Sequence, residues 1–114
     1  MHQTLPNVAR LSTRLAADNA RVTRFIDRMA QRVDALMDAL RQGDVGELRR
    51  LSENLVATSE SCGFDTVRYR AERVCEELLK PNNLRGIKRS VVHLIGACGS
   101  VRRTDQGQRE DWQI

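Results

Sequence analysis

The apolar residues between positions 22 and 40 recur at the period of an α-helix. They are separated by steps of one, three or four residues: Val22, Phe25, Ile26, Met29, Val33, Leu36, Met37 and Leu40. This spacing places them along one helical face, and the positions between them are mostly Arg, Asp and Gln, as on a solvent-facing surface. We therefore predict one continuous amphipathic helix over residues 22–40.

Turn and capping residues divide the rest of the chain into three further helices. Gly43 suits the residue that follows the first helix, and Asp44, with Glu47 three positions on, is typical of a helix start. The second helix is expected to run to about Ser61 and to stop at Gly63. We predict that Phe64 is the hydrophobic residue that precedes the third helix and that Asp65 is its N-cap.

The third helix is expected to end before Pro81, and Asn83 to cap the last one. Each of these three helices has an apolar stripe. The stripe of the second helix comprises Val45, Leu48, Leu51 and Leu55 with Ser59 or Cys62. That of the third comprises Val67, Ala71, Val74, Cys75, Leu78 and Leu79, and that of the last comprises Leu84, Ile87, Val91, Leu94, Ile95, Cys98 and Val101. Gly86, Gly96 and Gly99 each cost the last helix about 1 kcal/mol relative to alanine. We expect close helix packing to offset this cost, with fraying near Gly99 as the alternative.

Four amphipathic helices joined by short turns predict an all-α, up-down-up-down four-helix bundle. We assign residues 1–103 to this bundle, with a short extra helix around residues 5–16 across one end. Residues 104–114 are polar, lack an apolar stripe and are predicted to form a loose tail. No run approaches the roughly 18 apolar residues that span a membrane, and no secretory signal is present. The expectation is a cytoplasmic protein with no membrane partner.

The chain carries few patterns typical of catalysis or metal binding. It has no H-E-x-x-H and no Gly-rich phosphate loop, and its histidines are His2 and His93. We predict no enzyme activity, no cofactor and no metal site, with His93 a half-buried structural residue. Cys62, Cys75 and Cys98 have no C-x-x-C spacing and are interpreted as reduced, buried thiols.

The charge distribution indicates a basic region in the C-terminal part of the chain. The net charge is +4, and no acidic residue occurs between Glu77 and Asp105. Six basic residues fall there: Lys80, Arg85, Lys88, Arg89, Arg102 and Arg103. A basic face attracts acidic partners or phosphate. With 4% aromatic residues and no DNA-binding motif, however, nucleic acid is not the expected partner.

From Phe25 to Leu78 the chain resembles the histidine-containing phosphotransfer (HPt) domains of bacterial phosphorelays. Their active helix carries A-H-x-L-K-G-s-a, preceded by an amphipathic helix with an early Phe and a Gly-Asp turn. The matching positions, in a register without gaps, are Phe25, Leu36, Leu40, Gly43-Asp44, Leu48, Leu55, Gly63-Phe64, Ala71 and Leu78. The resemblance implies the same bundle and a role in two-component signalling.

The active motif departs from that family. Aligning SENLVATS with the motif places Ser52 on the alanine, Glu53 on the phosphoacceptor histidine, Val56 on the lysine and Ala57 on the glycine. Phosphotransfer needs a neutral imidazole nitrogen as nucleophile. Since both the nucleophile and the neighbouring cation are replaced, the resemblance implies an HPt-like protein that does not transfer phosphate itself.

The docking surface of such a protein can persist without the acceptor. The resemblance implies that a receiver domain or a histidine-kinase domain would contact a face comprising Arg28, Gln31, Arg32, Arg49, Arg50, Glu53, Ala57 and Glu60. Glu53 would either mimic a phosphohistidine, with one negative charge where phosphate adds about two, or be an ordinary surface residue paired with Arg49 or Arg50.

Two other functions stay open at this point. One is an active phosphotransfer protein that uses His93. The other is a structural bundle unrelated to phosphorelays, which dimerises through the small residues of its last helix. The sequence specifies neither the partner nor the oligomeric state.

Overall fold

The computed structural model describes the backbone of residues 17–112 and the side chains of residues 17–101. Residues 17–27 are helical, and four helices follow: α2 (Met29–Gln42), α3 (Val45–Cys62), α4 (Asp65–Leu78) and α5 (Leu84–Trp112). No strand occurs in this part of the chain. The predicted all-α fold is confirmed.

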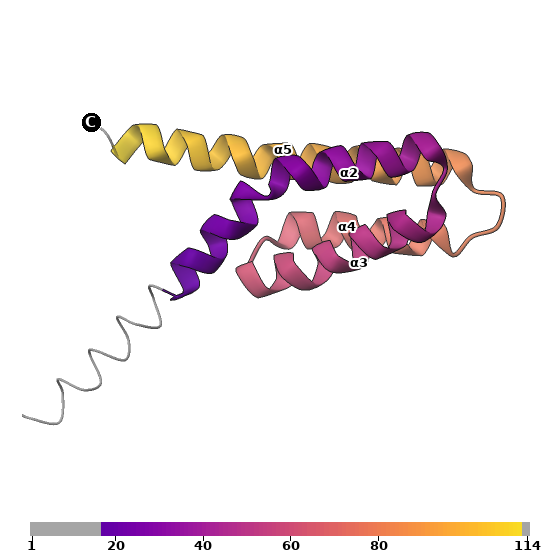
Figure 1. Cartoon of the computed structure of the whole chain (residues 1–114), viewed down its shortest axis with the longest axis horizontal. Helices are drawn as coiled ribbons and strands as arrows, with labels where there is room; N and C mark the ends of the chain where they lie inside the picture. Colours follow the sequence, from indigo (N-terminus) through magenta and orange to yellow (C-terminus); the bar gives the residue numbers. More distant parts are fainter. Residues whose placement is uncertain (1–16, 113–114) are drawn as a thin grey trace, which may run out of the picture.

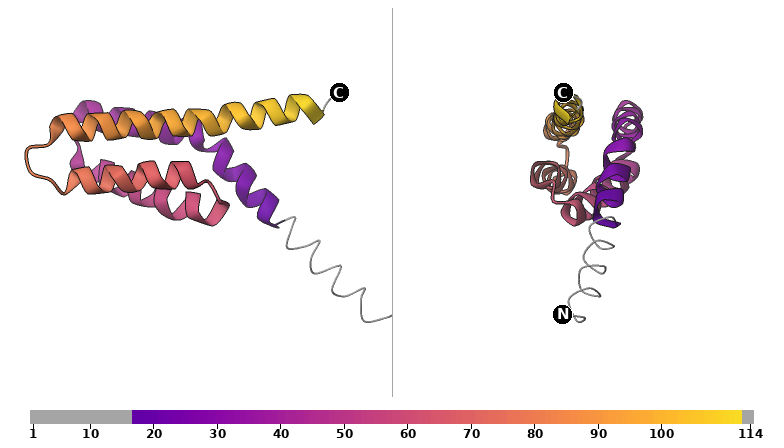
Figure 2. Two further views of the ribbon diagram at one scale, coloured as in Figure 1. Left: turned by 180° about the vertical axis from the view of Figure 1, so that it is seen from behind. Right: turned by 90° about the vertical axis from the view of Figure 1, so that its left-hand side faces the viewer.

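The four helices form a ring in which each packs against two neighbours. Helix α3 lies against α2 and α4, and α5 lies against α4 and α2. Consecutive helices run in opposite directions (Figure 1), and the end-on view shows the helices surrounding a common core (Figure 2). This is the expected up-down-up-down bundle.

The core is made by the apolar stripes of all four helices. Its largest fully buried side chains are Met29, Leu36, Leu48, Leu55, Val67, Val74, Val91, Leu94 and Cys98. Between the two candidates near the end of α3, Ser59 is the buried one, with its hydroxyl donating to the Leu55 carbonyl, and Cys62 is half-buried. Four residues predicted inward are exposed: Met37, Val45, Leu79 and Leu84. The last three lie at the ends of helices, where fewer neighbours cover them.

Left-handed glycines end α2 and α3 as predicted. Gly43 and Gly63 have φ of 67° and 79°, which glycine adopts without steric cost. Asp44 caps α3, since its carboxylate accepts a hydrogen bond of 3.0 Å from the Glu47 amide. The prediction for α4 was wrong by one position. Phe64 is the N-cap residue and Asp65 is already the first residue of the helix.

The prediction of one continuous helix over residues 22–40 was also wrong, because the helix is interrupted at residue 28. The chain turns at Arg28, which separates the helical residues 17–27 from α2 (Figures 1 and 2), although main-chain bonds of 3.1 Å continue on both sides of it. The bend lays residues 17–27 against the end of α3 and the start of α4. There the Phe25 ring stacks on Phe64, with ring centres 4.9 Å apart.

The C-terminal part of the chain differs from expectation as well. Helix α5 continues to Trp112, through residues that were predicted to form a loose tail from residue 104. This stretch contains no proline, and its Gln, Arg and Glu residues favour helix, so nothing in the sequence stops the helix. The extra helix predicted around residues 5–16 lies outside the described residues.

The glycines of α5 do not share one role. A Cβ at Gly86 would meet Glu77 Oε2 at 2.6 Å, so here glycine permits close packing. A Cβ at Gly96, by contrast, would meet no heavy atom within 4 Å, and this glycine is exposed. The expected close helix approach is therefore absent at Gly96.

We predict that Phe25→Ala destabilises the bundle by about 3 kcal/mol, because it removes a 3% exposed ring and its stacking contact with Phe64. Urea unfolding followed by circular dichroism measures this. Leu79→Ala is the control: its side chain is 76% exposed, and its effect should stay within about 0.5 kcal/mol. A Phe25→Ala cost no larger than that of the control would contradict the role assigned to the stack.

Candidate functional site: the exposed side of α3

The helix aligned with the phosphoacceptor motif presents a mixed surface. Glu53 and Ala57 are exposed, one turn apart, whereas Ser52 is fully buried. Val56, at the position aligned with the family lysine, is half-buried and packs against the core. Helix α3 therefore offers a carboxylate and a small residue to solvent, and neither an imidazole nor a cation at the aligned positions.

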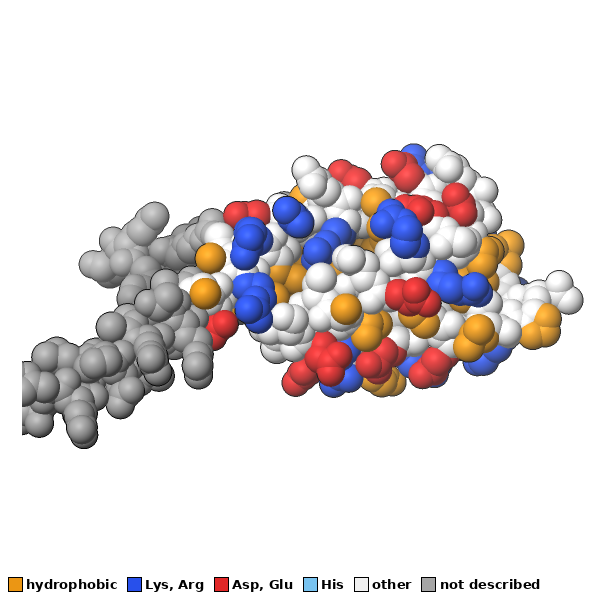
Figure 3. All heavy atoms as spheres, turned by 60° about the horizontal axis from the view of Figure 1, so that its bottom comes forward, with side chains coloured by type: hydrophobic (Ala, Val, Ile, Leu, Met, Phe, Trp, Pro, Cys, Tyr) orange, Lys and Arg blue, Asp and Glu red, His pale blue; other side chains and the backbone are white. Residues whose placement is uncertain are grey.

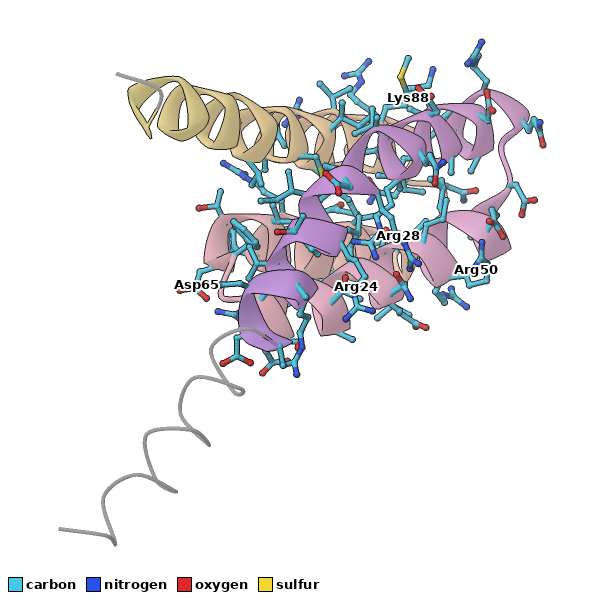
Figure 4. The ribbon with its side chains drawn as sticks, turned by 60° about the vertical axis from the view of Figure 1, so that its left-hand side comes forward. Arg24, Arg28, Arg50, Asp65 and Lys88 are labelled. Carbon is cyan, nitrogen blue, oxygen red and sulfur yellow. The ribbon has the colours of Figure 1, made fainter. Side chains whose placement is uncertain are left out.

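A groove of about 300 Å³ runs between α3 and the bent N-terminal segment. We call it the arginine groove; it is lined by Arg21, Arg24, Phe25, Arg28, Arg32, Ala57, Thr58, Ser61 and Cys62. Figure 4 shows Arg24 and Arg28 between the N-terminal segment and α3, with Arg50 farther along α3. In the space-filling view, some Lys and Arg side chains lie near the N-terminal segment and others are spread along the same face (Figure 3).

Most of the charge in this groove is not neutralised. Arg21 lies 4.0 Å from Asp18 and donates a 3.3 Å hydrogen bond to the Ser61 hydroxyl. Among the described side chains, no carboxylate lies within 4 Å of Arg24, Arg28 or Arg32. The groove is thus suited to an anionic group from a partner.

Arg32 is half-buried, whereas the other arginines of the groove are exposed. Its guanidinium lies over the Phe25 ring, 5.1 Å from the ring centre, which is a cation–π arrangement. Burial, and then the nearby charge of Arg28, lower the pKa of Arg32. Its Nη1 is buried without a hydrogen-bond acceptor among the described residues. A buried donor without an acceptor costs free energy in the folded state.

Glu53 does not belong to the arginine groove. It lines a separate, open hollow of about 390 Å³ between α3 and α4, with Val56, Glu72, Cys75 and Glu76. Burial, and then the charge of Glu53, raise the pKa of the Cys75 thiol, which the charge of Arg49 lowers in part. Both Glu53 and Arg49 therefore lie on the α4 side of α3.

The structure accordingly divides the predicted docking face. It brings together Arg28, Arg32 and Ala57 in the arginine groove. The others are exposed but lie outside that groove: Gln31, Arg49, Arg50, Glu53 and Glu60. The expected pairing of Glu53 was wrong, because Arg50 instead pairs with Glu47, at 2.9 Å through Nε, and Arg49 makes no ion pair within the described residues.

Sequence reasoning missed two arginines of the groove, Arg21 and Arg24, together with its uncharged lining residues Phe25, Thr58, Ser61 and Cys62. A signal was present: arginines at 21, 24, 28 and 32 are spaced by three and four residues, which places them on one face of a helix. The apolar stripe of the same segment indicated only its other face. Arg21 and Arg24 reach α3 only because the chain bends at Arg28.

His93 is exposed on α5, and not half-buried as predicted. It lines another groove, between α4 and α5, on a different side of the bundle from Glu53. Cys62, Cys75 and Cys98 are all free thiols. Within the described residues, no cluster of His, Cys, Asp or Glu is arranged to hold a metal ion, and no helix is both long and apolar enough to cross a membrane.

No family model matches the chain, and no curated protein or solved structure is significantly similar to it.

The two surfaces of α3 differ in charge, and the reactivity of the cysteine on each surface can measure this difference. Cys62 lies among the arginines of the groove, whereas Cys75 lies beside Glu53, Glu72 and Glu76. We predict that the ratio of alkylation rates with anionic iodoacetate and neutral iodoacetamide is several-fold higher at Cys62 than at Cys75. The difference should shrink in about 0.5 M salt, where the screening length is only a few ångströms.

Cys98 provides the internal reference for this experiment. Burial raises the pKa of its thiol to about 11, so at about pH 8 roughly one thiol in a thousand is ionised. Cys98 should react slowly with both reagents. Mass spectrometry of tryptic peptides measures all three sites in one sample, and equal ratios at Cys62 and Cys75 would contradict the electrostatic division.

Proposed function

We propose that this chain is an HPt-like signalling module of a bacterial two-component system, located in the cytoplasm, which docks a receiver or histidine-kinase domain and does not relay phosphate itself. The proposal combines the resemblance of residues 25–78 to HPt domains with the surface of α3. Glu53 stands at the aligned acceptor position, and a carboxylate does not replace an imidazole as the nucleophile in that reaction.

The observation that supports docking best is the arginine groove beside Ala57. A small residue at this point leaves the α3 backbone accessible, and Arg24, Arg28 and Arg32 surround it without a described counter-charge. An acidic surface placed there gains electrostatic steering and satisfies these donors. The matching partner surface is therefore a cluster of carboxylates, such as the acidic pocket that holds a receiver's phosphorylated aspartate.

The docking hypothesis predicts a specific effect of charge reversal. The double variant Arg24→Glu/Arg28→Glu should weaken binding to the cognate receiver or kinase domain by about tenfold or more, mainly through slower association. The matched control is Arg41→Glu/Lys88→Glu, which changes the net charge equally at exposed positions outside the groove. Biolayer interferometry against the receiver and kinase domains of the source genome measures both variants.

Equal losses in the two double variants would show that only net charge matters, and the groove assignment would be wrong. Absence of binding to every receiver and kinase domain, together with a dimer in light scattering, would favour the structural bundle instead.

A second candidate function is supported by the exposure of His93. This imidazole lies at the surface of a four-helix bundle with Arg70 and Arg89 in the same groove. If it were a phosphoacceptor, a ring nitrogen would attack the phosphorus of a receiver's aspartyl phosphate and release the aspartate carboxylate.

We expect no such transfer. Incubation with a receiver loaded with radioactive phosphate should leave the wild-type chain without acid-labile label. A label that appears in the wild type and is lost in His93→Gln would replace the proposed function by the second candidate, whereas a label retained in His93→Gln would exclude both.

A further inference from the structure

A second basic groove lies between α4 and α5, on a part of the bundle that the proposed docking surface does not use. It encloses about 510 Å³, and its lining includes Tyr69, Arg70, Arg73, Glu77, Arg85 and Arg89. Its volume falls within the range of roughly 300–1,000 Å³ typical of small-molecule sites. Its lining, however, is dominated by cationic and polar side chains, which suits a charged ligand.

The one carboxylate in the lining, Glu77, is committed to the fold. It is 8% exposed and accepts hydrogen bonds from Asn83 Nδ2, from Lys80 Nζ at 3.0 Å and from Arg73 at 3.2 Å. The bonds from Asn83 and Lys80 lower the pKa of Glu77, so this carboxylate is ionised at neutral pH. It forms ion pairs with Lys80 and Arg73, and Arg73 also pairs with Glu76 at 2.6 Å.

Three arginines of the groove keep an uncompensated charge. No carboxylate among the described side chains lies within 4 Å of Arg70, Arg85 or Arg89. Arg70 comes from α4 and the other two from α5, so the charges converge from both walls. The guanidinium of Arg70 also lies 5.6 Å from the centre of the Tyr69 ring, which is 53% exposed at the rim.

The positions of these arginines are fixed by the turn between α4 and α5. The Asn83 amide donates to the Glu77 carboxylate and, at 3.1 Å, to the Glu77 carbonyl, which ties the start of α5 to the end of α4. Gly86 leaves just enough space for this pair, because a Cβ there would overlap both side chains. Arg85 and Arg89, one turn apart on α5, therefore extend from a helix start that is tied to the end of α4.

We propose that this groove binds a small phosphate-bearing ligand, with Arg70, Arg85 and Arg89 on its phosphate oxygens and the Tyr69 ring available to stack on an attached base. A phosphate group carries up to about two negative charges at neutral pH, and guanidinium groups bind its oxygens through paired hydrogen bonds. Three convergent arginines match a diphosphate better than they match a single carboxylate.

The test uses inorganic pyrophosphate and ADP as probes, titrated into the whole chain at low salt by calorimetry. We expect both to bind, ADP more tightly because of Tyr69, and Arg70→Gln/Arg89→Gln to weaken both by about tenfold or more. The matched control, Arg41→Gln/Lys88→Gln, removes the same charge outside the groove and should change affinity by less than about twofold. Tyr69→Ala should weaken ADP and leave pyrophosphate unchanged.

Single-stranded DNA is the third probe, because nucleic acid carries the same phosphate chemistry. Binding of DNA alone, weakened by the groove variants, would overturn the small-ligand proposal in favour of a nucleic-acid surface. Failure of pyrophosphate to bind, or equal losses in the groove and control variants, would also overturn it. The site is independent of docking: Arg24→Gln/Arg28→Gln should leave phosphate binding intact, so the failure of either proposal does not imply failure of the other.

Discussion

The stacking of Phe25 on Phe64 is a contact on which the candidate docking surface depends. It joins the segment before α2 to the junction of α3 and α4, far along the chain. It is one of several contacts that hold residues 17–27 away from the axis of α2, since Ile26 also packs against the core and Arg21 donates to the Ser61 hydroxyl. The bend brings Arg21 and Arg24 to the arginine groove beside α3. An aromatic pair in the core therefore helps to position a charged surface.

The charges of this protein are not used to hold its helices together. Every ion pair between described side chains joins residues three or four positions apart in the sequence. Exposed pairs of this kind contribute little stability. Packing of the apolar stripes stabilises the bundle. The acidic residues in the local ion pairs neutralise basic residues that are close to them in the sequence. Several arginines without an ion pair among the described side chains line the two grooves, where they are available to bind a ligand or partner, and Arg49 is a further one outside both grooves.

Features set by residues close together in the sequence could be predicted, and features set by residues far apart in the sequence could not. Helix periodicity and the glycines at 43 and 63 are local signals, and they predict the bundle and the ends of α2 and α3. The bend at Arg28 is accompanied by contacts with Ser61 and Phe64, residues distant in sequence, and no local pattern marks it. The same reason explains the site: Arg28, Arg32 and Ala57 were predicted together, but Glu53 turns toward α4, which depends on how α3 rotates within the ring. His93 was misplaced because its neighbours Val92 and Leu94 suggested burial, whereas Val92 is itself 60% exposed.

The surroundings of Glu53 bear on whether it imitates a phosphorylated histidine. A phosphoryl group on a signalling helix is stabilised by nearby cations, and an imitating carboxylate would need the same neighbours. Glu53 instead shares its hollow with Glu72 and Glu76. Arg49 lies on the same side of α3 but does not line that hollow, and the arginines of the arginine groove lie on the other side. A partner that recognised the negative charge of Glu53 would need a basic surface opposite this residue. The arginine groove would repel that basic surface, unless the partner also carried an acidic surface opposite the groove. The geometry therefore does not support imitation of a phosphohistidine by Glu53, and under the proposed function the arginines beside Ala57 would contact the partner.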